Sequence, residues 1–264
     1  TFLGLQQFQE KPRIGLQFFL KTLKKPIKVT DLVFVIAPRI NAAGRMDQGL
    51  SAVELLMSDN LELALPKARS IDFFNTERRS TDERITVEAL QQIVLNEETT
   101  CFSTVVFHPS WHKGVIGIVA SRLIETYYRP TVVLTESEGV LSGSVRSVSG
   151  FDVYQALEAC SEFMIQFGGH KYAAGLTLKP EQLTGFKQCF EAYAEAHLLP
   201  EQLQPTYSYD LELQFDALTP KLYRIINQMA PFGPKNMRPV FVTHLCKDAG
   251  GTRAVGKKNN HLKL

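Results

Sequence analysis

The sequence has few of the residues that build disulfide frameworks or metal centres. Its four cysteines are far apart, form no CxxC pair and lie in or beside apolar runs: Cys101, Cys160, Cys189 and Cys246. This pattern is typical of reduced, buried thiols in a cytoplasmic protein. No stretch approaches the roughly 20 apolar residues of a membrane span, and no signal peptide is apparent. These absences argue against a secreted disulfide scaffold, a zinc module and a membrane partner.

Clustered carboxylates are also absent. The aspartates are scattered without a DxD, and there is neither a His-His pair nor an HExxH motif. A two-metal phosphoesterase needs several carboxylates and imidazoles that converge on two ions, so we expect no metal ligand in this chain. GxSxG, Walker and post-strand GxGxxG motifs are missing as well, which removes three common catalytic or nucleotide-binding signatures.

The bulk composition is that of an ordinary globular protein. The 264 residues are 44% hydrophobic and 21% charged, and a chain of this length predicts two or more folded units. The net charge of +2 and the pI near 8.3 are too mild to prove a nucleic-acid partner. Since Thr1 is not Met and the chain stops inside an apparent strand at Leu264, we expect an internal fragment of a longer protein.

The first hundred residues have a helical pattern. Apolar spacing predicts helices over 13–24, 30–36 and 49–57, with Pro38 ending the second and a loop over Asn41–Arg45. Asp59 is expected to cap a long helix that runs to about residue 96. Its middle, 75–84, is charged almost all round, which is typical of a helix that bridges domains through solvent. A domain boundary is therefore placed near residue 100.

After that boundary, strand and helix patterns alternate, which indicates an α/β fold. The predicted strands are 101–107, 131–134, 140–147 and 173–178. The predicted helices are 115–127, 152–163 and 181–197. Residues 200–205 are predicted to form a linker. The sequence pattern changes after it, and we expect strands over 207–213 and 240–246 and a helix over 219–229.

Three small-residue segments, each with a cation, suggest one anionic ligand held from several sides. They are Pro38–Arg45, Leu141–Ser147 and Gly168–His170. Arg45 and Arg146 can bind a phosphate bidentately. Adjacent glycines let a backbone approach a ligand closely, and His170 can donate a hydrogen bond or carry a proton.

Each segment also has a purely structural interpretation. Arg45 would then lie on the surface of a helix–loop–helix corner, Arg146 on a strand edge, and His170 in a glycine corner. In the turn from His108 to Val115, Trp111 would plug the end of the sheet and His112 would cap the next helix. The residues alone leave both interpretations open.

Four motifs in order resemble the RecJ family, the single-strand-specific 5′→3′ DNA exonucleases of the DHH phosphoesterase superfamily. They are Pro38–Arg45, Trp111–Ile118, Gly143–Ser147 and Phe167–His170. A further segment, Pro231–Asn236, is similar to the entry of the family's OB-fold. The resemblance covers most of the chain and corresponds to the C-terminal two thirds of the family pattern.

The resemblance implies an architecture. A remnant of a DHH domain would occupy 1–58, a connecting helix 59–100, a DHHA1 domain with a mixed sheet and flanking helices 101–204, and a partial OB-fold 205–264. In such enzymes the DHH domain holds two Mn²⁺ or Mg²⁺ ions through motifs that precede this segment. No metal ligand is therefore assigned here.

The same resemblance implies roles for individual residues. Arg45, Ser144 and Arg146 match positions associated with phosphate contacts, including the 5′ end of the strand. His170 matches the family histidine that faces the metals, and we expect it to stabilise charge on the scissile phosphate. Further substrate-binding candidates are Asn41, Gly168, Gly169 and His112.

The C-terminal segment fits a single-strand-binding surface. Residues 249–264 contain Arg253, Lys257 and Lys258 and no acidic residue, and OB-folds bind single strands through basic grooves and stacking aromatics. The alternative is a solvated basic tail.

The resemblance implies the substrate-binding part of a metal-dependent exonuclease of DNA repair and recombination, inactive on its own. Its substrate would be single-stranded DNA with a 5′ phosphate, and its partners a single-strand-binding protein and a RecQ-type helicase. Two alternatives stay open. One is a DHH-family phosphodiesterase of short oligonucleotides or cyclic dinucleotides, and the other is a non-catalytic single-strand-binding module.

Overall fold

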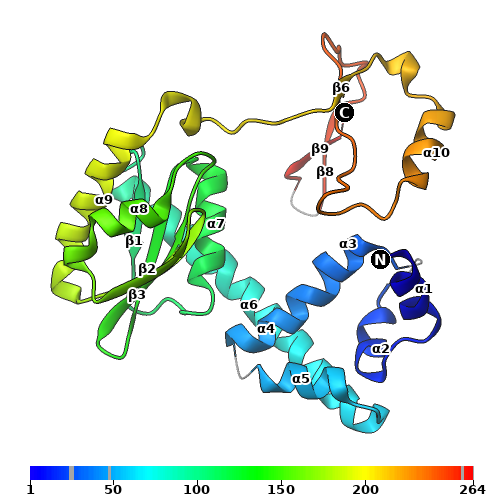
Figure 1. Ribbon diagram of the computed structural model, residues 1–264, viewed down its shortest axis with the longest axis horizontal. Helices are drawn as coiled ribbons and strands as arrows, with labels where there is room; N and C mark the ends of the chain where they lie inside the picture. Colours follow the sequence, from blue (N-terminus) through cyan, green and yellow to red (C-terminus); the bar gives the residue numbers. More distant parts are fainter. Residues whose placement is uncertain (24–26, 47–48, 257–258, 264) are drawn as a thin grey trace. The chain divides into compact units, whose positions relative to one another are not determined.

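The computed structural model describes residues 1–23, 27–46, 49–256 and 259–263 (Figure 1). The chain divides into two compact units. One runs from Leu3 to Pro205, and the other comprises Thr206–Leu264 with Thr1 and Phe2. The larger unit holds a helical part followed by a five-stranded sheet with its own helices.

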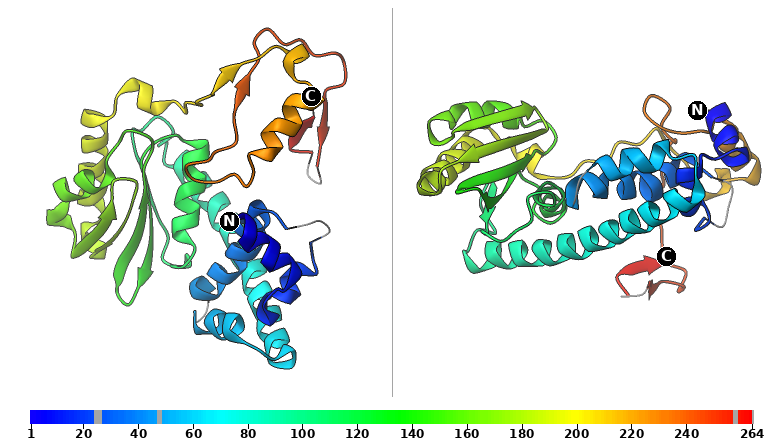
Figure 2. Two further views of the ribbon diagram at one scale, coloured as in Figure 1. Left: turned by 45° about the vertical axis from the view of Figure 1, so that its right-hand side comes forward. Right: turned by 90° about the horizontal axis from the view of Figure 1, so that it is seen from below.

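The helical part is built around one long helix (Figure 2). Its helices are α1 Phe2–Glu10, α2 Ile14–Leu20, α3 Val29–Asp31, α4 Ala37–Met46, α5 Leu50–Met57 and α6 Leu61–Leu95. Side chains from α2, α4, α5 and the first half of α6 form a buried apolar cluster that includes Phe19, Leu55 and Ile71. Burial of apolar area is the main favourable term that holds these short helices together.

The segment around Pro38 is helical, so the expected helix end and the expected loop over Asn41–Arg45 are both wrong. A π-helical turn over Leu32–Ile36 joins α3 to α4, and the N–H of Ala37 donates to the carbonyl of Leu32, five residues back. Proline has no N–H to give to the helix ladder. Because the chain widens to a π-helical turn directly before Pro38, the hydrogen bond that Pro38 cannot donate does not end the helix. Helix α4 therefore continues through Pro38 to Met46.

Helix α6 is not polar on every face, which corrects a second expectation. One stripe of it is buried at heptad-like spacing, through Ala64, Ala68, Ile71, Asn75, Asp82, Ile85, Ala89 and Ile93. The first half of this stripe packs in the helical part and the second half against the sheet unit. The middle of the stripe is polar, which is why the sequence reads as charged all round. The helix is capped by Asn60 rather than Asp59, because the Asn60 Oδ1 accepts from the N–H of Glu62 at 2.8 Å.

The sheet has the strand order β1-β2-β3-β5-β4. Its strands are β1 Thr104–Phe107, β2 Thr131–Ser137, β3 Val140–Arg146, β4 Gln166–His170 and β5 Ala173–Leu178. Strands β1 and β2 are parallel and are joined through α7 Ile116–Thr126; the remaining pairs are antiparallel. The expected α/β fold with a mixed sheet is confirmed.

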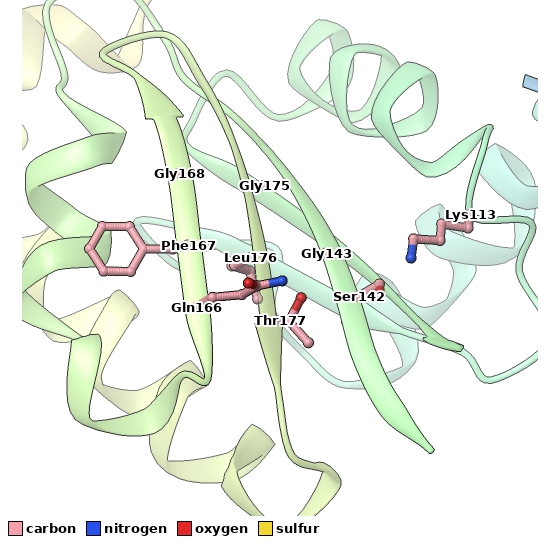
Figure 3. Close-up of a pocket in the computed structure, with 9 residues that line it drawn as sticks. All are labelled: Lys113, Ser142, Gly143, Gln166, Phe167, Gly168, Gly175, Leu176 and Thr177. Atoms are coloured by element: carbon pink, nitrogen blue, oxygen red, sulfur yellow. The ribbon is translucent and has the colours of Figure 1, made fainter. Parts of the chain in front are cut away.

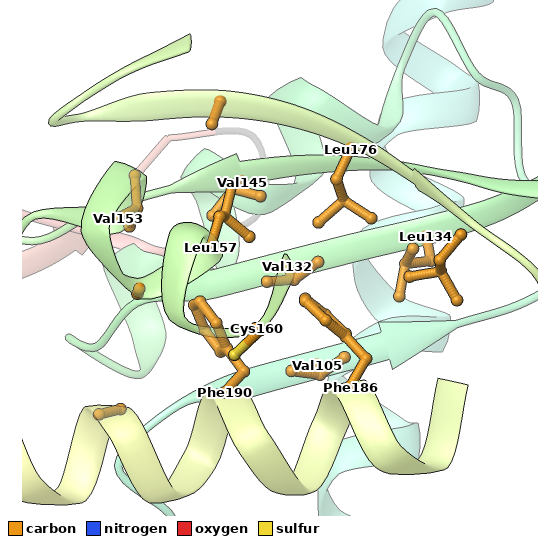
Figure 4. Close-up of a cluster of buried hydrophobic side chains, with 14 of the residues drawn as sticks. Val105, Val132, Leu134, Val145, Val153, Leu157, Cys160, Leu176, Phe186 and Phe190 are labelled. Atoms are coloured by element: carbon orange, nitrogen blue, oxygen red, sulfur yellow. The ribbon is translucent and has the colours of Figure 1, made fainter. Parts of the chain in front are cut away.

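Helices cover the two faces of this sheet unequally. On one face α6 and α7 pack against β1 and β2 around Val106 and Val133. On the same face the first turn of α7 reaches Ser144 and Arg146 of β3. Beyond it, β5, β4 and the rest of β3 have no covering helix among the described residues and present small polar residues (Figure 3). The opposite face is the main core, where α8 Val153–Ala159 and α9 Leu183–His197 bury residues such as Val145, Leu176 and Phe186 (Figure 4).

Two strand boundaries differ from expectation for identifiable reasons. Residues 166–170 form β4, not a glycine corner, and Lys171 and Tyr172 are the two-residue turn to β5. Strand β1 begins at Thr104 rather than at 101, because the backbone N–H groups of Phe102 and Ser103 donate to the carboxylate of Glu191 at 2.7 and 2.8 Å. Those donors are therefore taken from the strand ladder.

The smaller unit has short elements. They are β6 Leu211–Glu212, α10 Pro220–Gln228, β7 Phe241–Val242, β8 Arg253–Val255 and β9 His261–Lys263. Strands β6 and β7 pair in parallel, and β8 and β9 pair antiparallel. The expected helix over 219–229 is present, whereas the expected strands over 207–213 and 240–246 are reduced to two paired residues each.

Candidate functional site

Arg45 lies in the last turn of α4 and contacts the loop before α7. Its Nη1 donates to the carbonyl of Gly114 at 3.1 Å. A Cβ built on Gly114 would lie 2.1 Å from the Arg45 carbonyl oxygen, so only glycine allows this approach. Asn41 lies one helical turn before Arg45 and is also exposed, so the two share a helix face.

Ser144 and Arg146 lie two residues apart on β3 and therefore on the same face of the sheet. The Arg146 Nη1 donates to the Ser144 Oγ at 3.1 Å and to the Val145 carbonyl at 2.8 Å. The first turn of α7 lies over both side chains. A Cβ on Gly117 would approach the Ser144 Oγ to 2.9 Å and the Arg146 Nη2 to 3.1 Å, so glycine is again what permits the contact.

The electrostatics of this corner favour an anion. Burial lowers the pKa of the Arg146 guanidinium, and the positive charge of Arg45 lowers that pKa further. Burial also lowers the pKa of Arg78 on α6, where Asp82 opposes the shift and Arg45 adds to it. Within the described ranges, no carboxylate forms an ion pair with Arg45 or Arg146. The nearby N-terminus of α7 adds a partial positive charge.

His170 lies on the same face as Arg146, two strands away. It pairs with Ala173, which pairs with Arg146, so His170 and Arg146 are separated by two strand spacings, or roughly 10 Å. The His170 Nδ1 accepts from the N–H of Tyr172 at 3.2 Å. In the neutral ring the proton is therefore on Nε2, and no described residue accepts from it.

The turn that carries His170 is held in place by the backbone. The Tyr172 carbonyl accepts from the N–H of Ser147 at 3.0 Å, and the Lys171 carbonyl accepts from the N–H of Val153 at 3.1 Å. These bonds attach the β4–β5 turn to the end of β3 and the start of α8. Gly169 has φ of 152°, and a Cβ there would lie 2.4 Å from the Ala173 carbonyl oxygen, whereas a Cβ on Gly168 would meet nothing within 4 Å.

Trp111 and His112 have structural contacts. Trp111 is 3% exposed, and its Nε1 donates to Glu88 Oε2 at 2.8 Å. No side chain caps the start of α7, so the expected cap by His112 is wrong. The His112 Nδ1 accepts from the N–H of Gly114 at 3.1 Å. Through Gly114, His112 is next to Arg45.

The candidates of the smaller unit are only partly described. Arg253 is an exposed residue of β8, and Lys257 and Lys258 lie outside the described residues. Sequence reasoning missed the contributions of Gly114 and Gly117. Their signal is the pair of glycines that flank the start of a strongly apolar helix pattern, where a close approach to another element would be needed.

The described residues hold neither a metal-binding cluster nor a membrane-spanning helix. No group of three or more His, Cys, Asp or Glu side chains is placed to hold a metal ion among them. No described helix is long and apolar enough to cross a membrane.

Comparison with known proteins finds a domain match in each unit. Residues 98–196 match the DHHA1 domain, and residues 209–264 match the RecJ OB domain. The chain is 34% identical over 268 residues to the single-stranded-DNA-specific exonuclease RecJ of Bacillus subtilis, covering 99% of this chain and 34% of the relative. Against the Escherichia coli protein of the same name the identity is 31%, over 100% of this chain and 47% of the relative.

Solved structures of RecJ proteins also superpose on this chain. RecJ of Thermus thermophilus in complex with Mn²⁺ superposes with a TM-score of 0.80 at 30% identity, covering 91% of this chain and 35% of that one. An exonuclease RecJ bound to manganese superposes with a TM-score of 0.65 at 30% identity, covering 74% and 49%. The chain thus spans about a third to a half of the length of these proteins.

Proposed function

The chain carries a DHHA1 domain followed by a RecJ OB domain, and from this we propose that it is the substrate-binding part of a single-stranded-DNA-specific 5′→3′ exonuclease. The observation that carries the proposal is the convergence of Arg45 and Arg146 on one corner without a carboxylate from the described residues. An anion between two guanidinium groups relieves their mutual repulsion, and the anion of such a substrate is a phosphate.

Each group at this corner has a defined part in binding the 5′ phosphate. Arg45 and Arg146 supply charge and N–H donors. The Ser144 Oγ accepts from Arg146, which leaves the Ser144 hydroxyl proton free to donate to a phosphate oxygen. The start of α7 at Gly117 adds backbone dipoles of the favourable sign.

His170 acts at a different phosphate in this proposal. Its Nδ1 is occupied by the Tyr172 N–H, so its Nε2–H is the group that can donate to the scissile phosphate. A donor aimed at an oxygen whose charge grows during displacement lowers the barrier more than it tightens binding. The roughly 10 Å between His170 and Arg146 matches two different phosphates of one strand better than a single one.

The described residues do not fit a divalent metal, because they offer no group of three ligating side chains. No step of hydrolysis is therefore assigned to an ion here. Mn²⁺ or Mg²⁺ is in this proposal the cofactor of the whole enzyme, as in the two Thermus structures that contain these ions. We expect that the 264-residue chain alone does not cleave DNA.

The domain assignment belongs to the same proposal. It takes 1–58 as the end of a DHH domain, 59–100 as the connecting helix, 101–204 as the DHHA1 domain and 205–264 as the OB domain. The exposed Arg253, with Lys257 and Lys258, would follow the strand backbone. The corresponding cellular role is DNA repair and recombination in the cytoplasm, with a single-strand-binding protein and a RecQ-type helicase as partners.

Arg146→Ala tests the proposal. Binding of a fluorescent oligothymidylate with a 5′ phosphate should weaken about 10- to 100-fold, because a charge-assisted hydrogen bond contributes about 1.5–3 kcal/mol. Binding of the same oligonucleotide with a 5′ hydroxyl should change less than about threefold. Arg84→Ala removes an equal charge from an exposed ion pair with Glu88 and is the matched control.

Two outcomes would contradict the proposal. The first is an unchanged preference for phosphorylated ends in Arg146→Ala. The second is tighter binding of a dinucleotide than of a long strand, which would favour a phosphodiesterase of short substrates. Cleavage of DNA by this chain with Mn²⁺ would separately refute the expectation that it is inactive alone.

A further inference from the structure

A hollow of about 380 Å³ opens on the uncovered face of β3, β5 and β4, beside the proposed phosphate corner (Figure 3). Its volume is at the small end of the range of about 300–1,000 Å³ for ligand pockets. Its lining includes Lys113, Ser142, Gln166, Gly168, Gly175 and Thr177. Four of these side chains, those of Lys113, Ser142, Gln166 and Thr177, have no part in the function proposed above.

Strand register arranges this face in three rows. The first is Arg146, Ala173 and His170; the second is Ser144, Gly175 and Gly168; the third is Ser142, Thr177 and Gln166. Successive rows are two residues apart along the strands, or about 6.6 Å. The first row carries the ionic groups, and the third lies about 13 Å from it.

The second row is a flat floor. Gly168 and Gly175 have no side chains, and a Cβ on Gly168 would meet nothing within 4 Å. A ligand can therefore lie against the backbone of β5 and β4 at this level, between the first row and the third.

The third row is polar and unpartnered. Ser142 is 6% exposed, and its hydroxyl has no hydrogen-bond partner in the described ranges. The same holds there for the hydroxyl of Thr177 and the amide of Gln166. Figure 3 shows these three side chains on one face, with Phe167 directed away and Lys113 reaching toward them from the loop before α7. Hydroxyl and amide groups both donate and accept, as the edge of a nucleobase does.

We infer that this hollow binds the base of the nucleotide whose 5′ phosphate lies at Arg45 and Arg146. This rests on the proposed function. The sugar would cross the glycine row, and the base edge would meet Ser142, Thr177 and Gln166. Because hydroxyl and amide groups can rotate to suit different edges, the pocket would accept every base with modest preferences.

The experiment compares three probes on the 264-residue chain by calorimetric titration: thymidine 5′-monophosphate, 2-deoxyribose 5-phosphate and the dinucleotide pTpT. The monophosphate should bind about 10-fold more tightly than deoxyribose phosphate. In Thr177→Val/Gln166→Ala that ratio should fall to about 2, because two hydrogen bonds are lost, while the affinity for deoxyribose phosphate stays the same.

Thr184→Val/Gln188→Ala makes the same chemical changes on exposed positions of α9 and should keep the wild-type ratio. Circular dichroism and thermal melting establish that both double variants are folded.

The outcomes separate the inference from the function that it rests on. Equal binding of the monophosphate and deoxyribose phosphate by the wild-type chain overturns the inference and leaves phosphate binding intact. Extra affinity that appears only with pTpT and is lost in Lys113→Ala assigns the hollow to a second phosphate, which also overturns it. Failure of all three probes to bind overturns both the inference and the proposed function.

Discussion

The adjacent glycines of β4 should respond oppositely to the same substitution. At Gly169 an added methyl group would lie 2.4 Å from the Ala173 carbonyl oxygen and 2.5 Å from the Ala174 Cα, at a φ of 152°. The unfavourable φ costs about 1–3 kcal/mol, and the clash with backbone atoms adds about 1–3 kcal/mol. We expect Gly169→Ala to lower the free energy of unfolding by about 3 kcal/mol.

Gly168→Ala is the matched comparison. Its methyl group would meet nothing within 4 Å, and alanine in a strand is more favourable than glycine by about 0.5–1 kcal/mol. The stability of this variant should be unchanged or slightly higher. The methyl group would nevertheless stand on the glycine row, so binding of thymidine 5′-monophosphate should weaken.

Urea denaturation followed by circular dichroism measures both variants, since a change of the midpoint at constant slope is a change of stability. Equal midpoints for Gly168→Ala and Gly169→Ala would refute the reasoning, because it depends on the different surroundings of the two Cβ positions. A destabilised Gly168→Ala would show that the face over β4 is covered.

Two further predictions concern buried polar groups. Arg129→Ala should lower the free energy of unfolding by about 3 kcal/mol or more in urea, because the buried guanidinium donates to the carbonyls of Glu98, Thr99 and Cys101; a loss below about 1 kcal/mol would contradict this. Burial, and secondly contact with Cys189, raises the pKa of the Cys160 thiol, so the folded chain keeps a proton that the unfolded chain loses above about pH 8.5. The free energy of unfolding should therefore fall as the pH rises beyond that value, by at most about 1.4 kcal/mol per pH unit. In Cys160→Ala this fall should be shallower than in the wild type. Identical slopes of the free energy of unfolding against pH would contradict the prediction.

Local pattern predicted the helices and strands that are strongly periodic, such as α7, α9 and β5, and the mixed α/β fold. It failed where a long-range contact decides the structure. The Gly-Gly pair of β4 has no intrinsic strand preference, and these residues are a strand because they pair with β5. The N–H groups ahead of β1 would extend the strand, but the distant Glu191 takes them.

The candidate site was likewise predictable in its residue types but not in the long-range contacts that bring the residues together. Residue types alone suggested that Arg45, Ser144, Arg146 and His170 share an anionic ligand. Their common location depends on strand register and on two helix contacts that only Gly114 and Gly117 allow. Neither register nor those close approaches is a property of local sequence, so no reading of single segments would find them.

The sheet itself explains why ligand groups gather on one side of β3, β5 and β4. Alternation gives each strand two faces, and α8 and α9 require one of them to be apolar across the sheet. On the other face, α6 and α7 cover β1, β2 and the nearest part of β3. On this face the residues of β4 and β5 are exposed or half-buried, so packing does not dictate them and small polar groups are tolerated at no cost to the core. Since the boundary of the cover is the α7 N-terminus at Gly117, the favourable end of a helix dipole lies beside the bare surface. Moving the cations to the core face would bury their charge, whereas at this boundary Arg146 is only half buried and stays accessible to an anion.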